Sequence, residues 1–81
     1  MERDYMLQIH LKEDDTTTVV HAVLDVGKDH FASMGKARRN PNDPQIPEIG
    51  EELAIARALQ DLTWKVMESA QAKIEKYLGD N

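Results

Sequence analysis

The last third of the chain repeats apolar residues at steps of three or four, which is typical of a helix with one face turned inward. The members of this apolar stripe are Ile55, Ala56, Leu59, Leu62, Val66, Ala70, Ile74 and Tyr77. No proline follows Pro47, so we expect one long C-terminal helix over about residues 50–78. Gly50 is the expected N-cap, and Gly79 suits the position after the last helical turn.

Three segments before this helix alternate in polarity or are rich in β-branched residues, as strands are. They cover about residues 4–12, 17–26 and 30–38. A polar loop at 13–16 and a two-residue turn at Gly27-Lys28 separate them. The pattern predicts a single α+β domain, in which a three-stranded antiparallel sheet has one face covered by the long helix. Residues 39–49 form the connecting loop.

The two turns also predict a register for each hairpin. In the first hairpin Ile9 lies opposite Val20, and in the second Val20 lies opposite Gly35 and Leu24 opposite Phe31. Both registers place the apolar residues of the strands on one face. Small residues gather on that face and leave room for the helix to approach closely: Ala22, Ser33, Gly35 and Ala37.

The predicted helix is longer than the sheet that receives it. It would span about 43 Å at 1.5 Å per residue, whereas the strands span only about 30 Å. The helix therefore either kinks near Leu62-Thr63 or overhangs the sheet. An overhanging stripe needs a partner, and a core of this size contributes only about 3–5 kcal/mol, so we expect a homodimer. Trp64 lies off the stripe and is either a dimer contact, which we favour, or a cap over the helix flank.

Composition limits the possible chemistry and the cellular compartment of the protein. The chain has 81 residues, a net charge of −5 and no cysteine, which excludes disulfides and cysteine-ligated zinc. The first residues lack the pattern of a signal peptide, and no apolar run reaches membrane-spanning length. These features predict a cytoplasmic protein without a membrane segment.

A basic cluster is predicted at one end of the sheet, where Lys12, Lys36, Arg38 and Arg39 come together. RNA or ribosome binding would use such a cluster for phosphates. No aromatic residue is expected on the same face, which argues against recognition of single-stranded bases. The alternative is a solubilising edge that protects the third strand from pairing.

The outer face of the sheet also carries three histidines. The predicted register makes His10 and His21 diagonal neighbours, with His30 two rows past His21, so a third ligand is not obvious. We therefore expect no metal site. A modest apolar patch on this face is a candidate contact surface, or simply part of a solvated face: Met6, Val23, Ala32 and Met34.

The loop before the helix contains three prolines, which stiffen it. It is either a structural connector or a recognition loop, with Asn40 and Pro41 as candidate partner contacts. Arg57 on the helix flank either pairs with Asp61 four residues later or reaches back to hold this loop.

Carboxylates gather at the helix start, at Glu48, Glu51 and Glu52. No nucleophile or opposing base accompanies them, so stabilisation of the positive helix end explains them better than catalysis. We expect no enzymatic activity, cofactor or small-molecule substrate.

Two segments resemble a known family: Gly35-Lys36-Ala37-Arg38-Arg39-Asn40-Pro41 and the stretch from Ile46 to Leu62, which begins Ile-Pro-Glu-Ile-Gly-Glu-Glu-Leu. The chain is similar to small actinobacterial proteins that form a family of unknown function, some of them associated with dormancy and stress. The resemblance implies a fold like that of double-stranded-RNA-binding domains and a likeness to ribosome hibernation factors. Beyond Leu62 the chain departs from the family pattern.

Two functional hypotheses follow. The first is a non-enzymatic stress protein that acts on RNA or the ribosome through the basic cluster. The second is a protein-interaction module that acts through the proline loop and the outer sheet face, without nucleic acid.

Overall fold

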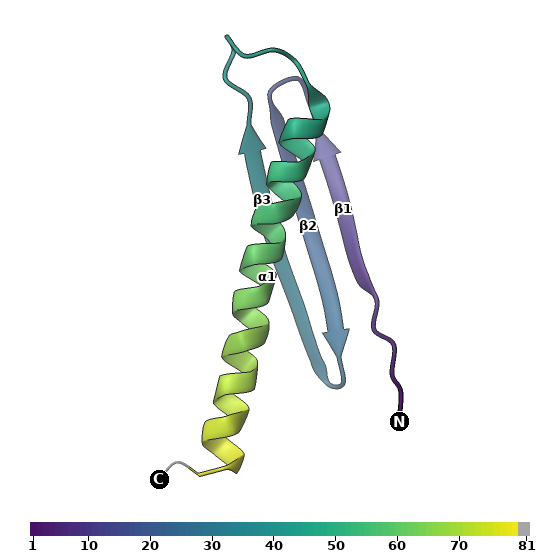
Figure 1. Cartoon of the computed structure of the whole chain (residues 1–81), viewed down its shortest axis with the longest axis vertical. Helices are drawn as coiled ribbons and strands as arrows, with labels where there is room; N and C mark the ends of the chain where they lie inside the picture. The colour runs from purple at the N-terminus through teal and green to yellow at the C-terminus, as the bar shows by residue number, and fades with distance from the viewer. Residues whose placement is uncertain (80–81) are drawn as a thin grey trace.

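The computed structural model describes residues 1–79, in which three strands precede one helix. The elements are β1 (Leu7–Glu13), β2 (Thr17–Val26), β3 (Asp29–Arg38) and α1 (Pro47–Tyr77). The strands form one antiparallel sheet in the order β1-β2-β3, and α1 lies against one face of it (Figure 1). The predicted α+β fold is confirmed.

The hairpin between β2 and β3 has the predicted register. Val20 lies opposite Gly35, and Leu24 lies opposite Phe31. Gly27 has a φ of 60°, whereas Lys28 has no left-handed backbone, so the turn is of the type that requires glycine at its first position. A two-residue turn of this type fixes the pairing of every residue that follows.

The hairpin between β1 and β2 differs from the prediction by two residues. Ile9 lies opposite Ala22, not Val20. The reason is a shorter turn, because the N–H of Asp14 donates to the carbonyl of Thr17 at 2.9 Å. Only two residues then remain in the turn, where the sequence suggested four. A shift by an even number of residues keeps every side chain on its predicted face.

The helix begins three residues before the predicted N-cap. Ile46 is the N-cap without a side-chain hydrogen bond, and Pro47 occupies the first helical turn. Proline suits this position because its fixed φ is already helical and its missing N–H would be unpaired there. Gly50 therefore lies inside the helix. The other end agrees with the prediction, since α1 ends at Tyr77 and Gly79 has a φ of 68°.

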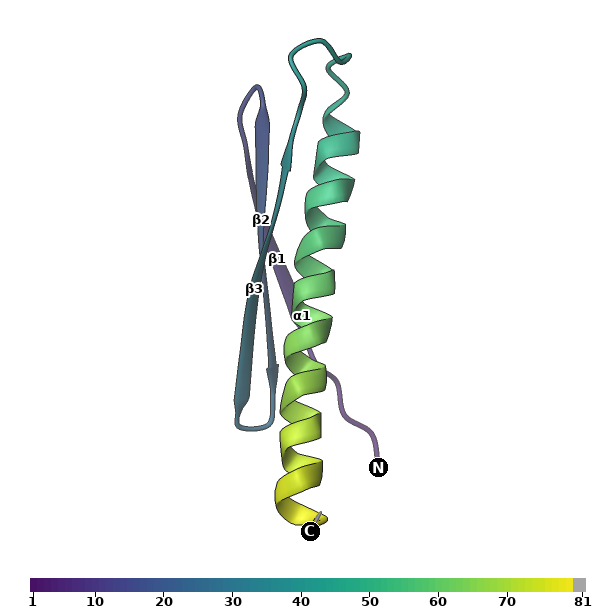
Figure 2. The same cartoon turned by 90° about the vertical axis from the view of Figure 1, so that its left-hand side faces the viewer.

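The 31 residues of α1 form one continuous helix, which settles the choice between a kink and an overhang. At 1.5 Å per residue it is about 46 Å long, and the molecule is 54 Å in its longest dimension. The C-terminal end of the helix extends past the β2–β3 turn (Figure 2). Among residues 1–79, this helix lacks the apolar character needed to cross a membrane.

The core lies where α1 approaches β3 most closely. A Cβ atom built on Gly35 would lie 2.1 Å from the carbonyl oxygen of Ala54 and 2.3 Å from the nitrogen of Ala58. The Oγ of Ser33 donates to the carbonyl of Ala58 at 2.8 Å. The predicted stripe was therefore wrong about its centre, because the helix turns Ala54 and Ala58 to the sheet and leaves Ala56 exposed. The buried apolar residues are Val20, Ala22, Ala37, Ala54, Ala58 and Leu62.

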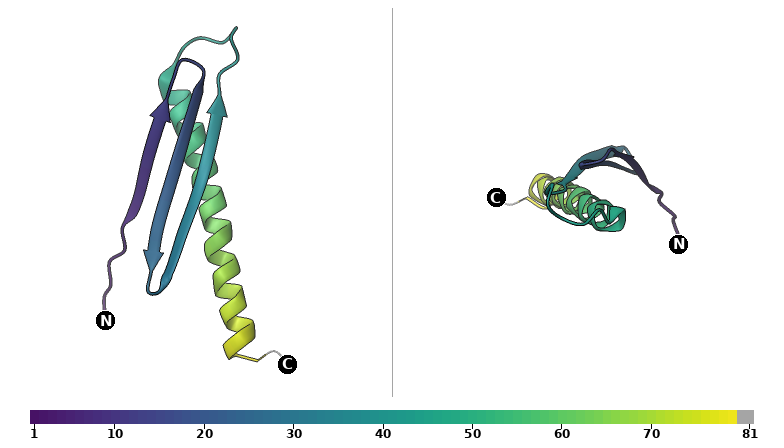
Figure 3. Two further views of the ribbon diagram at one scale, coloured as in Figure 1. Left: turned by 180° about the vertical axis from the view of Figure 1, so that it is seen from behind. Right: turned by 90° about the horizontal axis from the view of Figure 1, so that it is seen from above.

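The helix crosses the sheet diagonally. It begins near the β1–β2 turn, runs over β2 and β3, and leaves the sheet on the β3 side (Figures 1 and 3). Its contacts are mainly with β3 and secondarily with β2. The first half of β1 is left beside the helix, so Leu7 and Ile9 keep 44% and 42% of their surface exposed although they face inward.

Candidate binding surfaces

The basic side chains of the sheet lie on its outer face, away from α1. Lys12 and Lys36 flank Val19 in one cross-strand row, and Arg38 lies opposite Thr17 in the next row. The three basic side chains are exposed. We call Lys12, Lys36 and Arg38 the outer basic face.

Arg39 does not belong to this surface. Its guanidinium donates to the backbone carbonyls of Asp15, Asn40 and Asp43, the last at 3.0 Å. The side chain thereby ties the β1–β2 turn to the loop after β3. The role that the sequence suggested for Arg39, contact with a partner, competes with this structural one.

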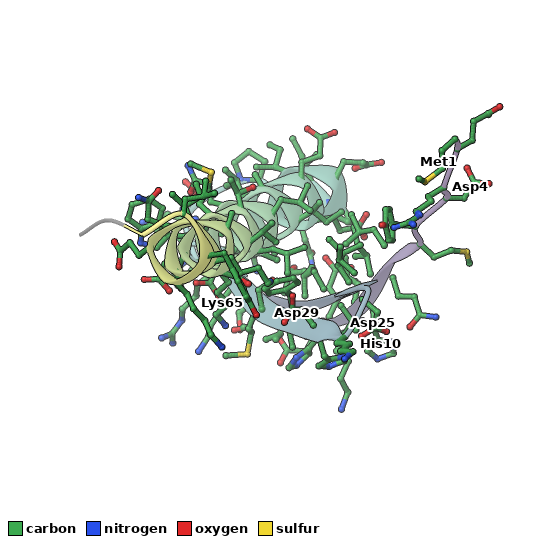
Figure 4. The ribbon with its side chains drawn as sticks, turned by 90° about the horizontal axis from the view of Figure 1, so that it is seen from below. Met1, Asp4, His10, Asp25, Asp29 and Lys65 are labelled. Atoms are coloured by element: carbon green, nitrogen blue, oxygen red, sulfur yellow. The ribbon has the colours of Figure 1, made fainter. Side chains whose placement is uncertain are left out.

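The histidines lie as predicted on the outer face but not in the predicted arrangement. His10 and His21 are directly opposite each other, because of the two-residue shift in register, and Met34 follows in the same row. His30 is not part of this row. Its Nδ1 lies 2.6 Å from the Oδ1 of Asp25. Figure 4 shows His10 and Asp25 on the side of the sheet away from the helix. Within residues 1–79, no three His, Cys, Asp or Glu side chains are grouped to hold a metal.

The loop from Asn40 to Ile46 is held by hydrogen bonds within the loop as well as by Arg39. The N–H of Asp43 donates to the carbonyl of Asn40 at 2.9 Å, and the Oδ1 of Asn40 accepts the N–H of Asn42 at 3.2 Å. Both Asn40 and Pro41 are exposed. The predicted connector is therefore a defined loop whose tip faces solvent.

A groove of about 520 Å³ lies between this loop, the β1–β2 turn and the start of α1. Its apolar lining includes Pro44, Ile46, Ile49 and Leu53, and Arg38 and Arg39 contribute polar walls. Ile49 and Leu53 are 55% and 45% exposed, which is high for apolar residues of this size. The groove was not predicted from the sequence, since its walls come from three separate segments.

Three cations of α1 bind the free edge of β3. Arg57 donates to the carbonyl of Lys36 at 2.8 Å, and Lys65 donates to the carbonyl of Ala32 at 2.6 Å. Lys73 forms an ion pair with Asp29 at the start of β3. The three cations follow one another at intervals of eight residues in the sequence. We call Arg57, Lys65 and Lys73 the edge cap.

Arg57 binds neither of the two partners that the sequence suggested for it. Its guanidinium binds the backbone of β3, not Asp61 and not the proline loop. Asp61 pairs with Lys65 at 3.3 Å. The charge pattern of the helix did indicate i, i+4 pairs, but a backbone carbonyl as acceptor leaves no mark in the sequence.

Two carboxylates near the β1–β2 turn have shifted pKa values of opposite sign. The pKa of Asp14 is lowered from its usual 3.8, chiefly because its carboxylate accepts the N–H groups of Thr16 and Thr17 at 2.9 and 2.8 Å. The pKa of Glu51 is raised from its usual 4.5, because its carboxyl group shares a hydrogen bond with Glu13 and is repelled by that charge. One end of the sheet therefore holds two carboxylates in close contact.

A second, shallower groove runs between β1 and α1. Its lining is almost entirely apolar, and it consists of Leu7, Leu24, Leu59, Leu62, Thr63, Val66 and Met67. Met67 is 58% exposed, and Trp64, on another side of the helix, is 65% exposed. Past the sheet, Ile74 and Tyr77 of the predicted overhanging stripe are also exposed. Apolar surface is therefore open both beside β1 and on the overhang.

These features define a small α+β protein with a curved three-stranded sheet, one long helix and exposed surfaces on both sides of the sheet. The chain belongs to the Rv2632c-like family, whose profile matches residues 3–81. The family resemblance seen in the sequence is confirmed at this level.

Individual relatives agree with this assignment. The uncharacterised protein Mb1767 of Mycobacterium bovis is 35% identical over 79 residues, which is 91% of this chain and 84% of that protein. Rv2632c of Mycobacterium tuberculosis, also uncharacterised, is 35% identical over 69 residues, 85% of this chain and 74% of that protein. The crystal structure of Rv2632c is similar with a TM-score of 0.90 and 30% identity, and the match covers 100% of this chain and 96% of that one.

Proposed function

We propose that this protein is a non-enzymatic, cytoplasmic binding protein whose outer basic face contacts the phosphates of RNA, free or in the ribosome. The observation that carries the proposal is the separation of charge across the molecule. The chain has a net charge of −5, yet Lys12 and Lys36 flank Val19 in a row of the outer face that holds no carboxylate, and the next two rows away from the β1–β2 turn hold none either. Those rows are Lys12/Val19/Lys36, His10/His21/Met34 and Gln8/Val23/Ala32.

The carboxylates nearest to this face do not cancel its charge. Asp14 lies at the turn, where two backbone N–H groups hold its carboxylate. Glu48, Glu51 and Glu52 belong to the helix, which packs on the opposite face of the sheet. An approaching polyanion would therefore meet cations first on the outer face and would be repelled from the helix start.

The chemistry of this face favours phosphate contact over base reading. The four aromatic side chains of the chain are Tyr5, Phe31, Trp64 and Tyr77. Phe31 packs against the core on the inner side of the sheet, Tyr5 precedes β1 and is 51% exposed, and the other two belong to the helix. Without an aromatic on the outer face, unpaired bases have no stacking surface. Contact with the backbone or shape of structured RNA suits such a face.

The family resemblance points in the same direction. The similarity to dormancy- and stress-associated proteins, and the implied likeness to double-stranded-RNA-binding domains and ribosome hibernation factors, supports a role on RNA under stress. A likeness of fold supports a function only by association, so the proposal depends on the charges of the outer face.

Co-sedimentation with purified ribosomes and with a structured RNA tests the proposal. Three phosphate contacts predict that affinity falls about 20- to 40-fold between about 50 and 200 mM salt. The double variant Lys36→Glu/Arg38→Glu should abolish binding. The matched control is Lys28→Glu/Lys76→Glu, which changes the net charge equally but at the β2–β3 turn and the helix end, and should bind far better than the first variant. Equal loss in both variants, or binding that salt does not affect, contradicts the proposal.

A second candidate function is a protein-interaction module, and the groove beside the proline loop favours it. Exposed Ile49 and Leu53 line this groove next to a stiff loop that could hold a peptide. Substituting both residues by Asp should abolish binding of a protein partner and leave RNA binding intact. The variant Lys12→Glu/Lys36→Glu, whose two residues do not line the groove, should have the opposite effects.

A further inference from the structure

The two edges of the sheet are treated differently by the rest of the chain. On β3, the edge cap binds the carbonyls of Lys36 and Ala32 and the carboxylate of Asp29. A second chain could not pair with this edge without displacing these cations. On the other side β1 is also an edge strand, and α1 runs away from it (Figure 1). Among residues 1–79, the β1 edge is therefore the open edge of the sheet.

The open edge is also where apolar surface is exposed. Leu7 and Ile9 are 44% and 42% exposed, whereas Val20 and Ala22 on the neighbouring strand are completely buried. Beside Leu7 lies the shallow groove along α1, with Met67 on its far wall. Such a strand can offer a second chain both backbone hydrogen bonds along its edge and apolar side chains on its inner face.

We propose that β1 pairs with β1 of a second copy of this chain, antiparallel and across a two-fold axis at Ile9, to form a continuous six-stranded sheet. A two-fold axis requires that the same patch contact itself. With the axis at Ile9, this residue lies opposite Ile9 of the second copy, and Leu7 lies opposite Leu11 of the second copy. The inward side chains of β1 then meet only apolar partners at the centre.

The outer side of the same pairing contains no like charges in direct opposition. Gln8 lies opposite His10 of the second copy, and Met6 lies opposite Lys12 of the second copy. Like charges directly opposite one another would destabilise a ladder, and this register avoids them. Shifting the axis to His10 would place Leu7 opposite Glu13, so the axis at Ile9 is the better match.

Charge at the ends of β1 supports the same geometry. Glu13 and Glu51 hold two carboxyl groups in contact at the C-terminal end of β1. In the antiparallel arrangement, the N-terminal segment of the second copy, with Arg3 and Tyr5, continues towards this end. This segment precedes β1, so an extension of the ladder by two residues would bring Tyr5 opposite Glu13 and place the Arg3 cation near the carboxylate pair.

The overhanging stripe, from which the sequence suggested a dimer, is a weaker candidate. Its exposed apolar residues, Ile74 and Tyr77, alternate with Lys73, Glu75 and Lys76 on the last two turns of the helix. Charged residues are depleted at the centres of interfaces. The β1 edge combines backbone pairing with an apolar strip that no charge interrupts from Leu7 to Leu11.

Single cysteines test this arrangement cleanly, because the chain has none of its own. In Ile9→Cys the two thiols would face each other across the axis, where opposite residues of antiparallel strands are close enough for a disulfide. Treated with diamide at about 10 μM protein, Ile9→Cys should form a covalent dimer roughly a hundredfold faster than an unpaired thiol, because the pair has an effective concentration of about 1 mM.

Two controls make the result decisive. Met34→Cys places a thiol on the outer face of β3 at a site that is 56% exposed, against 42% for Ile9, so random collision would favour Met34. Ile74→Cys reports a dimer through the overhang. Rapid cross-linking of Ile9→Cys alone supports the proposal, with circular dichroism confirming the fold of each variant. Equal rates for Ile9→Cys and Met34→Cys, faster cross-linking of Ile74→Cys, or a monomeric mass for the unmodified chain in light scattering would overturn it.

Discussion

The inner face of the sheet has two regions that differ in how they meet the helix. Under α1, the strands β2 and β3 present Val20 and Gly35, and the helix presents alanines. The backbones of α1 and β3 therefore lie so close that a Cβ atom on Gly35 would not fit between them. Beside α1, the strand β1 presents Leu7 and Ile9 to open space. The larger apolar residues are thus in the less buried region. Close packing here depends on small side chains, and the large side chains of β1 stay partly exposed.

The sharpest test of this comparison is Gly35→Ala. The added Cβ would lie 2.1 Å from the carbonyl oxygen of Ala54, so the helix must move. Overpacking costs about 1–3 kcal/mol, and backbone obstacles place this change at the upper limit. Urea unfolding followed by circular dichroism measures the loss. Gly27→Ala is the control, since its site is open and only its φ of 60° is strained; it should lose about 1 kcal/mol. Equal losses would show that the close approach is unimportant.

Along the helix, the same comparison predicts different effects of truncating two aliphatic residues. Leu62 is 5% exposed, and Leu62→Ala should cost about 2–3 kcal/mol through lost burial and a cavity. Ile74 is 48% exposed past the sheet, and Ile74→Ala should change the unfolding free energy by less than about 0.5 kcal/mol. Thermal unfolding at several protein concentrations checks both values. A large, concentration-dependent loss in Ile74→Ala would instead identify the overhang as an interface.

The edge cap offers a smaller but more specific effect. Replacing Arg57 by Ala removes its hydrogen bond to the Lys36 carbonyl and should cost about 0.5–1.5 kcal/mol. Removing Arg57, Lys65 and Lys73 together should also open the β3 edge, so that light scattering detects species larger than in the parent protein. Lys76→Ala, which removes a cation that contacts the Tyr77 ring, is the control and should not associate further. Unchanged association in the triple variant would show that the cations do not protect the edge.

The smallest effects concern the two shifted carboxyl groups at the end of β1. The folded-state pKa of Glu51 is raised, so its contribution to stability is fully present at low pH and is lost as the pH rises through that pKa. We expect Glu51→Gln to raise the unfolding temperature near pH 7 and to have no effect near pH 3. Stabilisation that persists at the lower pH would contradict the repulsion by Glu13.

Asp14 should behave in the opposite way. Its folded-state pKa is lowered, so its contribution is present above the unfolded-state pKa and is lost as the pH falls through the folded-state value. Asp14→Asn should therefore lower the unfolding temperature near pH 7 and approach the parent protein in acid. A difference in unfolding temperature that does not depend on pH would mean that the Asn side chain loses the hydrogen bonds of Asp14 because of its geometry, not because it lacks the charge.

The sequence was sufficient for much of the fold. Alternation assigned Leu7, Ile9 and Leu11 to the inner face, and the Gly27-Lys28 turn fixed the second hairpin exactly as observed. The first hairpin was predicted with a shift of two residues, because the pattern of a polar run does not show which of its residues close the turn. Asp14, which binds the two N–H groups that follow, was the available signal.

The candidate surfaces were less predictable. Lys12, Lys36 and Arg38 were placed on one face from alternation alone, since a strand's side chains have only two directions. Arg39 and Arg57 bind backbone carbonyls, and such acceptors are present at every position of a sequence. The centre of the helix face was missed for a related reason. Ala54 and Ala58 carry little apolar signal, yet their small size is what the approach to Gly35 requires.

The edge cap has a consequence for how many copies can join. A sheet with two free edges can pair with further chains at both edges without limit. A sheet with one edge covered by side chains of its own helix can pair at the other edge alone, so two such sheets that pair leave no free edge for a third. With Arg57, Lys65 and Lys73 on the β3 edge, the proposed joining of two sheets through β1 would therefore stop at two copies.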